Sequence, residues 1–145
     1  MYGTETGFRA KYDAADLTAL FGDLTAGEQT TWIEQALAEQ SDELDGYCLG
    51  RYAVPLHESD SVLNYVYQLA WWALCRRRNW NYTDQEQKNE KELRRRLELI
   101  AAHKFHLKDQ SSAQSADNRT SLRATDPSAR VTGRRRIMGR DRLEF

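Results

Sequence analysis

The chain has 145 residues, of which 40% are hydrophobic and 30% are charged, and its formal net charge is −1. This length and apolar content suit one globular domain with its own core, and they exclude a chain that is disordered throughout. The sequence has no apolar run long enough to span a bilayer, and its first residues lack the basic and apolar regions of a secretory signal. We therefore expect a protein of the cytoplasm.

The charge is divided unevenly along the chain. Residues 1–110 hold 13 Lys/Arg and 18 Asp/Glu, which gives −5, whereas residues 111–145 hold 8 Arg and 4 Asp/Glu, which gives +4. From Ser111 onward the chain is rich in Ser, Asp, Asn and Arg and loses its helical periodicity. We therefore predict a helical domain over 1–110 and an extended basic C-terminal tail over 111–145, which becomes ordered on a partner. Fully extended, the tail could reach about 115 Å.

Hydrophobic periodicity predicts an all-α fold, a small bundle of about four helices, with no alternating strand pattern before the tail. The first helix is short, from about Asp13 to Leu20, and Gly22 is expected to end it in a left-handed conformation. The second runs from about Ala26 to Leu49. It is opened by Thr25 and Glu28, which have the spacing of a capping box.

A third helix is predicted from about Ser61 to Arg78, after Pro55, with Ser59 or Asp60 as its cap. It is apolar on nearly every face, and such a helix is usually buried on every side. Because a small domain cannot easily cover one helix completely, we predict a subunit interface at its large aromatic residues. These are Tyr65, Tyr67, Trp71 and Trp72.

A second capping box, Thr83 with Glu86, begins the fourth helix, which extends to about Ala102. Arginine triplets at 76–78 and 94–96 raise the possibility of nucleic-acid binding. A structural role explains both equally well. Arginines favour the last turn of a helix, and those at 94 and 96 follow glutamates by four residues. We prefer the structural interpretation for these two triplets.

No pattern in the sequence indicates catalysis. Cys48 and Cys75 lack metal-site spacing and are expected to be buried free thiols. His103 and His106 have a spacing that can hold a metal, but a third ligand is not evident. The sequence contains no nucleophile, phosphate-loop or dinucleotide motif. We therefore expect no catalytic, cofactor-binding or metal-binding residues. An enzyme would need a polar pocket around the two histidines.

A third arginine triplet lies in the C-terminal tail, interleaved with apolar residues. Apolar anchors beside arginines favour docking on a protein, because arginines pair with acidic surfaces while the anchors fill grooves. Binding of nucleic acid by the same tail is the alternative, although a domain of net charge −5 repels a phosphate backbone. The predicted partner-binding residues are Arg134, Arg135, Arg136, Ile137, Met138, Arg140 and Phe145.

Several stretches together resemble a known family. They are the opening MYGT, the pair Phe21-Gly22, the segment from Glu43 to Tyr47 with Arg51-Tyr52 and Pro55-Leu56, and the closing sequence from Arg135 to Leu143. In this combination the chain resembles the Mu-like head–tail connector proteins of tailed bacteriophages. The most specific part is DGYxxxRYxxPL, from Asp45 to Leu56.

The resemblance implies a structural virion protein of the neck, assembled in the host cytoplasm. It implies a dodecameric ring beneath the portal protein that joins the DNA-filled head to the tail, with the C-terminal tail as a docking strap. The implied partners are the portal protein, neighbouring copies of the chain, and a tail-side connector or tail terminator protein. DNA would pass through the ring without specific binding, and no membrane or cofactor is implied. A small nucleic-acid-binding protein is the alternative.

Overall fold

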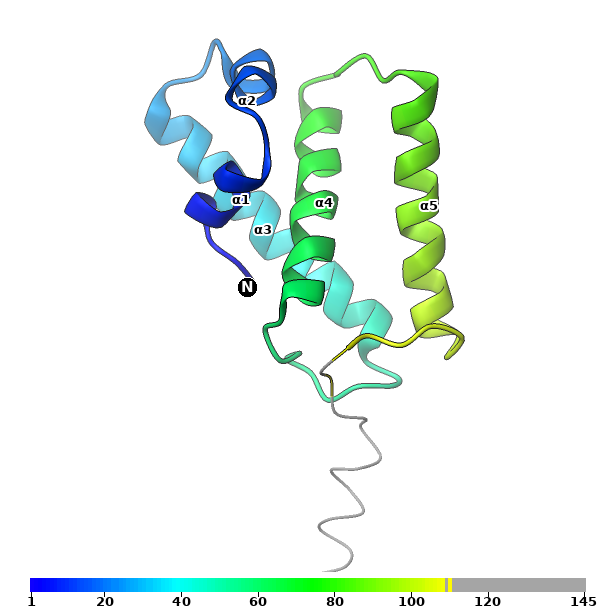
Figure 1. The fold of residues 1–145 in the computed structure, drawn as a ribbon. Helices are drawn as coiled ribbons and strands as arrows, with labels where there is room; N and C mark the ends of the chain where they lie inside the picture. The colour runs from blue at the N-terminus through cyan, green and yellow to red at the C-terminus, as the bar shows by residue number, and fades with distance from the viewer. Residues whose placement is uncertain (109, 111–145) are drawn as a thin grey trace, which may run out of the picture.

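The computed structural model describes residues 1–108 and 110, and the predicted C-terminal tail therefore lies outside the described residues. The all-α prediction is confirmed, because the described residues form helices and no β-strand (Figure 1). There are five helices in this part of the chain rather than about four. They are α1 (Glu5–Lys11), α2 (Ala14–Phe21), α3 (Ala26–Cys48), α4 (Asp60–Arg77) and α5 (Asp84–Ala101).

The longest helix, α3, organises the bundle by packing against α4, α5 and α1. In Figure 1 it passes behind α4 and ends near the lower end of α5; α4 and α5 run side by side, and α1 and α2 lie on the side of α4 away from α5. The buried face of α3 is apolar except for Gln40 and Ser41. The largest side chains with almost no exposure come from all five helices. They are Phe8, Leu20, Phe21, Ile33, Leu37, Leu44, Val62, Val66, Leu69, Leu74, Leu97 and Ile100.

Side-chain caps fix where four of the five described helices begin, and three of them are α3, α4 and α5. Both predicted capping boxes are present, with the N–H of Thr25 donating to Glu28 Oε2 at 2.9 Å and the N–H of Thr83 donating to Glu86 Oε2 at 2.7 Å. For α4 the cap is Ser59, whose Oγ accepts from the N–H of Val62. These polar side chains satisfy N–H groups that have no partner inside their own helix.

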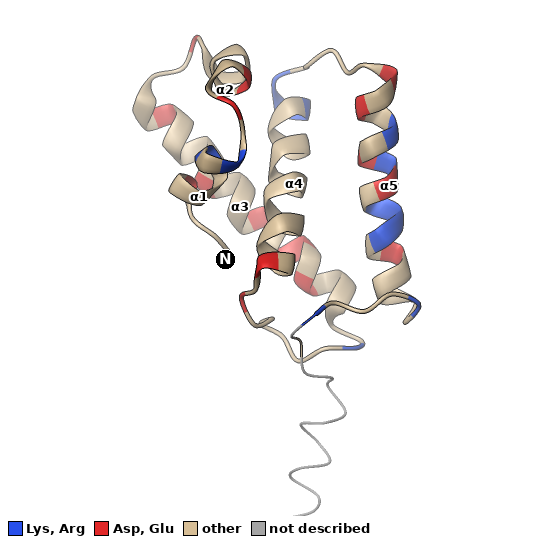
Figure 2. Ribbon diagram, in the orientation of Figure 1, with Lys and Arg blue, Asp and Glu red and all other residues tan. Residues whose placement is uncertain are grey.

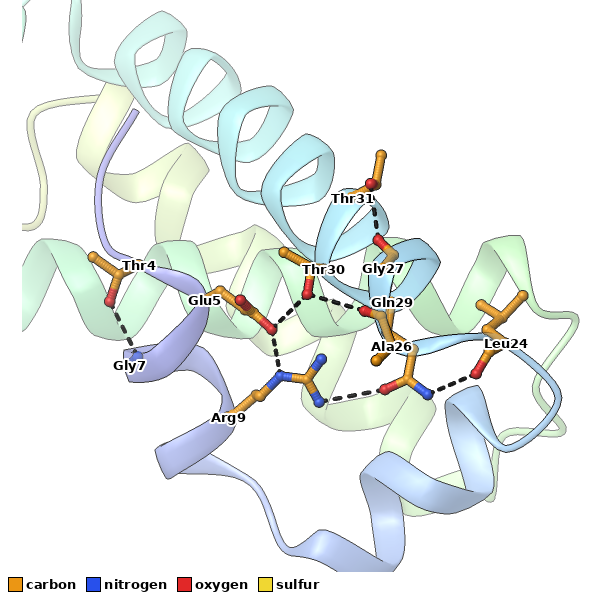
Figure 3. Close-up of polar contacts among 10 residues, drawn as sticks. All are labelled: Thr4, Glu5, Gly7, Arg9, Leu24, Ala26, Gly27, Gln29, Thr30 and Thr31. Atoms are coloured by element: carbon orange, nitrogen blue, oxygen red, sulfur yellow. Dashed lines mark hydrogen bonds and ion pairs between the residues drawn. The ribbon is translucent and has the colours of Figure 1, made fainter.

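The helix that periodicity missed, α1, is held to α3 by a polar junction (Figure 3). Thr4 caps α1 by accepting from the N–H of Gly7 at 3.1 Å. Glu5 Oε1 accepts from Arg9 Nε at 2.6 Å and from Thr30 Oγ1 of α3 at 3.0 Å. The bond from Arg9 is the main reason that the pKa of Glu5 lies below its usual range. The junction fixes α1 against the first turns of α3.

Gly7 and Gly22 are both required by space rather than by a left-handed backbone. A Cβ on Gly7 would lie 2.3 Å from the hydroxyl oxygen of Tyr67, so α1 approaches α4 closely only through glycine. The prediction that Gly22 is left-handed is wrong, since its φ is −55°. A Cβ there would lie 2.6 Å from the carbonyl oxygen of Thr18. Glycine is therefore needed because the chain turns tightly against the end of α2.

The chain itself covers most of α4. The expectation that a small domain leaves one face of such an apolar helix uncovered is therefore wrong. Tyr65, Tyr67 and Trp72 are each at most 9% exposed, and Trp71 is partly buried. Tyr12, from the link between α1 and α2, donates its hydroxyl hydrogen to the carbonyl oxygen of Tyr67 at 3.0 Å. The aromatic character of α4 is thus explained by its own core, and a role of these residues in a subunit interface stays a prediction.

Candidate partner-binding surfaces

The end of the bundle from which the C-terminal tail leaves is here named the base. It consists of the α3–α4 connection, residues 49–59, and residues 102–110, which follow α5. Figure 1 shows both segments at the same end of the molecule. Most of the DGYxxxRYxxPL segment lies here, beginning in the last turn of α3. The geometry of the base therefore determines where the tail starts.

Two tyrosine hydroxyls hold the base together: that of Tyr2 joins it to the start of the chain, and that of Tyr52 joins its two segments. Tyr2 donates to Asp45 Oδ1 at 2.6 Å and accepts from the N–H of Leu56 at 2.6 Å. Burial, followed by the bond to Asp45, raises the pKa of Tyr2 well above its ordinary value. The hydroxyl of Tyr52 accepts from the N–H of Leu107 at 2.9 Å. These bonds satisfy buried backbone groups of irregular segments, so the base is a fixed part of the domain.

The last described contact of the chain lies at the base. Gln110 binds the backbone of His57 twice, accepting from its N–H at 2.8 Å and donating to its carbonyl oxygen at 2.7 Å. Arg51 donates to the carbonyl oxygen of Phe105 at 2.7 Å. Leu49 and Phe105 are 63% and 43% exposed, and they are two of the three large hydrophobic residues in the described part of the chain that are exposed. The base thus combines a fixed exit for the tail with exposed apolar side chains.

Both arginine triplets of the helices are used largely in ion pairs inside the chain, which agrees with their structural interpretation. The triplet at the end of α4 pairs with three acidic residues, and Arg94 of α5 pairs with two glutamates. By contrast, α3 carries acidic residues and no lysine or arginine (Figure 2). The pairs are Arg76–Glu90, Arg77–Glu39, Arg78–Asp23, Arg94–Glu43, Arg94–Glu90 and Arg96–Glu92.

A groove of about 330 Å³ lies between α4 and α5. Its aromatic wall is the stacked pair of Tyr12 and Trp71, with ring centroids 4.4 Å apart and planes at 17°. Periodicity placed Trp71 and Trp72 on a buried helix but did not reveal the groove, because its other residues come from distant parts of the sequence. The lining residues are Tyr12, Gln68, Trp71, Trp72, Asn89, Glu92, Leu93 and Arg96.

The family model described as Bacteriophage Mu, Gp36 matches residues 2–125. This chain belongs to the bacteriophage Mu Gp36 family. The match covers all five helices and the base, and membership in the Gp36 family makes the chain a bacteriophage structural or assembly protein. A comparison with curated proteins finds no match.

The range of the Gp36 match does not reach the predicted partner-binding residues of the tail. It includes the first part of the C-terminal tail but ends before the arginine triplet at 134–136. The predicted partner-binding residues from Arg134 to Phe145 therefore lie outside both the matched range and the described residues. The DGYxxxRYxxPL segment lies inside the match, and the structure gives Tyr52 and Leu56 of this segment a role in building the base.

Within residues 1–108 and 110 of this Gp36-family chain, no three His, Cys, Asp or Glu side chains lie together as metal ligands would. His106 is contacted by the guanidinium of Arg51 and is exposed, as is His103. In the same part of the chain, no helix combines the length and apolar character that crossing a bilayer requires. The histidines thus lie at the base, and the described residues place no further metal ligands beside them.

Cys48 and Cys75 are buried free thiols, as predicted from the sequence. Burial raises the pKa of Cys48 to about 11 and that of Cys75 to about 12, above the ordinary thiol value of about 8.5. Because the folded pKa values are raised, the thiols stabilise the fold below pH 8.5 and lose this contribution as the pH rises toward those values.

We therefore expect both thiols of this Gp36-family protein to resist alkylation near pH 8, because the reactive thiolate is scarce and buried. Iodoacetamide should modify the folded protein about a hundred-fold more slowly than the protein in urea, as followed by mass spectrometry. Equal rates in the two conditions would show that these cysteines are not in the core.

Proposed function

We propose that the chain is a head–tail connector of the virion neck, which forms a dodecameric ring beneath the portal protein and joins the DNA-filled head to the tail. The observation that carries the proposal is the base, where Gln110 and the hydroxyl of Tyr52 fix the start of a long basic tail on a rigid helical body. Membership of the Mu Gp36 family supports the phage context. A rigid body with a fixed strap suits a protein that links larger assemblies.

The charges of the helical body support a ring through which DNA passes without specific binding. Residues 1–110 carry a net charge of −5, and most arginines of the two helical triplets are paired with acidic side chains. The net negative charge of this body repels a phosphate backbone. In this proposal the protein catalyses no reaction and needs no cofactor.

The C-terminal tail is the docking strap in this proposal. Its arginines at 134–136 and 140 pair with acidic surfaces, and Ile137, Met138 and Phe145 enter apolar grooves. These surfaces belong to the portal protein, to an adjacent copy of the chain, or to a tail-side connector or terminator protein. The exposed Leu49 and Phe105 at the base add apolar area near the point where the strap begins. The strap and the base together form the attachment surface.

The test is a native mass measurement of the full-length protein with and without portal protein. We expect a complex of one portal ring with twelve copies of the chain. A variant with Arg134→Glu, Arg135→Glu and Arg136→Glu should not bind the portal. The matched control carries Lys88→Glu, Lys91→Glu and Arg95→Glu, the same change of charge on exposed α5 residues without ion pairs in the described part of the chain.

Binding to duplex DNA, measured at several salt concentrations, tests the nucleic-acid-binding alternative. If the tail is a DNA-binding element, affinity for DNA should fall with salt with a logarithmic slope of about five, and the tail variant should remove it. Such binding, without any complex with portal protein, would replace the connector by the nucleic-acid-binding alternative. We expect portal binding and no salt-dependent affinity for DNA.

A further inference from the structure

The groove between α4 and α5 has the chemistry of a binding site for a short peptide segment. Trp72 and Leu93 are buried and make its apolar floor, while Tyr12 and Trp71 are partly buried and stack on each other. Polar side chains with hydrogen-bonding capacity stand at its edges. These are Gln68, Asn89, Glu92 and Arg96.

This combination matches an arginine followed by aliphatic residues. A guanidinium binds well over the face of an aromatic ring and to a carboxylate, and an aliphatic side chain fills an apolar floor. Glu92 is paired with Arg96 at 3.3 Å, but both side chains are more than half exposed, so the ion pair contributes little free energy. Glu92 can therefore leave Arg96 and pair with an incoming arginine at little cost. The stretch from Arg134 to Met138, Arg-Arg-Arg-Ile-Met, has the required order of side chains.

We propose that this groove binds residues 134–138 of a second copy of the chain. The inference rests on the ring proposed above, in which copies lie side by side. Each copy then gives its tail to one neighbour and receives the tail of the other, a head-to-tail contact of the kind that closes into a ring. The last residues of the tail, among them Arg140 and Phe145, are then left to bind the portal protein.

The chain is long enough for the tail to reach the groove of a neighbouring copy in the proposed ring. Gln110 is fixed at the base, and residues 111–133 can span up to about 80 Å before Arg134 is reached. The helix that borders the groove, α5, has 18 residues and is only about 27 Å long. The opposite charges of the body, −5, and the tail, +4, also attract tail and body of different copies.

Disulfide trapping between two full-length chains tests the inference. One chain carries Asn89→Cys in the groove and the other carries Met138→Cys in the tail, and the two are mixed and oxidised in the presence of portal protein. The native thiols, Cys48 and Cys75, are buried and do not compete. We expect a covalent dimer of the two chains. Lys91→Cys, on the exposed face of α5 and outside the groove, is the matched control and should give at least ten-fold less dimer.

A second comparison tests the chemistry of the groove. Glu92→Lys in the groove-bearing chain should lower the yield of the dimer several-fold, whereas Glu98→Lys, an exposed α5 residue that does not line the groove, should leave it unchanged. A disulfide that forms within one chain carrying both cysteines, but not between chains, would show that the tail occupies its own groove and would overturn the proposal.

The outcomes separate this inference from the connector proposal. If the portal complex forms but Asn89→Cys gives no more dimer than Lys91→Cys, the groove does not bind the tail and the connector proposal still stands. If the dimer forms between chains but no complex with portal protein is found, the contact between copies is correct and the attachment to the portal is wrong. Absence of both results overturns both proposals.

Discussion

A chain that ends after Ser111 is expected to fold as the full-length protein does but to lose its attachment to portal-bearing heads. The helical contacts described here all lie within residues 1–110, including the bonds of Gln110 to His57 and of Leu107 to Tyr52. Removal of the tail therefore leaves the core intact while removing all of the predicted partner-binding residues from Arg134 to Phe145. Co-sedimentation with heads, and thermal unfolding of the isolated protein, measure the two effects separately.

The control for this truncation is a chain in which residues 112–133 are kept and only residues 134–145 are removed. Both truncations should fail to join heads if the basic-apolar end is the docking element. If the chain ending after Ser111 joins heads normally, the docking strap is wrong, and the exposed residues of the base become the better candidate for attachment. Loss of folding in the truncated chain is not expected, because the core of the described residues lies entirely before Ser111.

Phe8→Ala is the second change with a large expected effect, on stability rather than assembly. Phe8 has no exposure, and its ring centroid lies 5.0 Å from that of Tyr12, 6.2 Å from that of Tyr67 and 6.5 Å from that of Trp71. Replacing a buried phenylalanine by alanine removes apolar contacts and leaves a cavity, which costs about 3–5 kcal/mol in the free energy of unfolding.

Urea unfolding of Phe8→Ala and of Thr6→Ala, an exposed residue of the same helix, gives the comparison. We expect the exposed substitution to change the free energy of unfolding by less than about 0.5 kcal/mol. A loss below about 1 kcal/mol for Phe8→Ala would mean that α1 unfolds separately from the rest of the bundle. In that case the wall of the α4–α5 groove formed by Tyr12 and Trp71 would also be loosely held.

The four longer helices were predictable because apolar residues recur at helical spacing in each. Two of them, α3 and α5, carry a second signal, a capping box that the structure confirms. Short α1 offers seven residues and only one buried side chain, Phe8, so no periodic pattern can be seen. Its position depends on contacts with Tyr67 and Thr30, which are far away in the sequence.

The candidate surfaces were less accessible to sequence analysis. The aromatic residues of α4 were correctly expected to be buried, but which surface buries them depends on how α1, α3 and the loops fold over the helix. The groove is made by Tyr12, Trp71 and residues of α5, a set that no local pattern connects. Tyr2 gave no signal of its own, although its hydroxyl holds both Asp45 and the backbone of Leu56.

The joint between His57 and Gln110 has a consequence for how relatives of this protein diverge. Every contact described for the bundle is made by residues 1–110, and the last of them is the side-chain amide of Gln110 on the backbone of His57. In the connector proposal, changes in the sequence beyond Gln110 alter the docking partner and leave these described contacts in place. A phage whose portal differs would then need changes in this one segment, with the helical body kept.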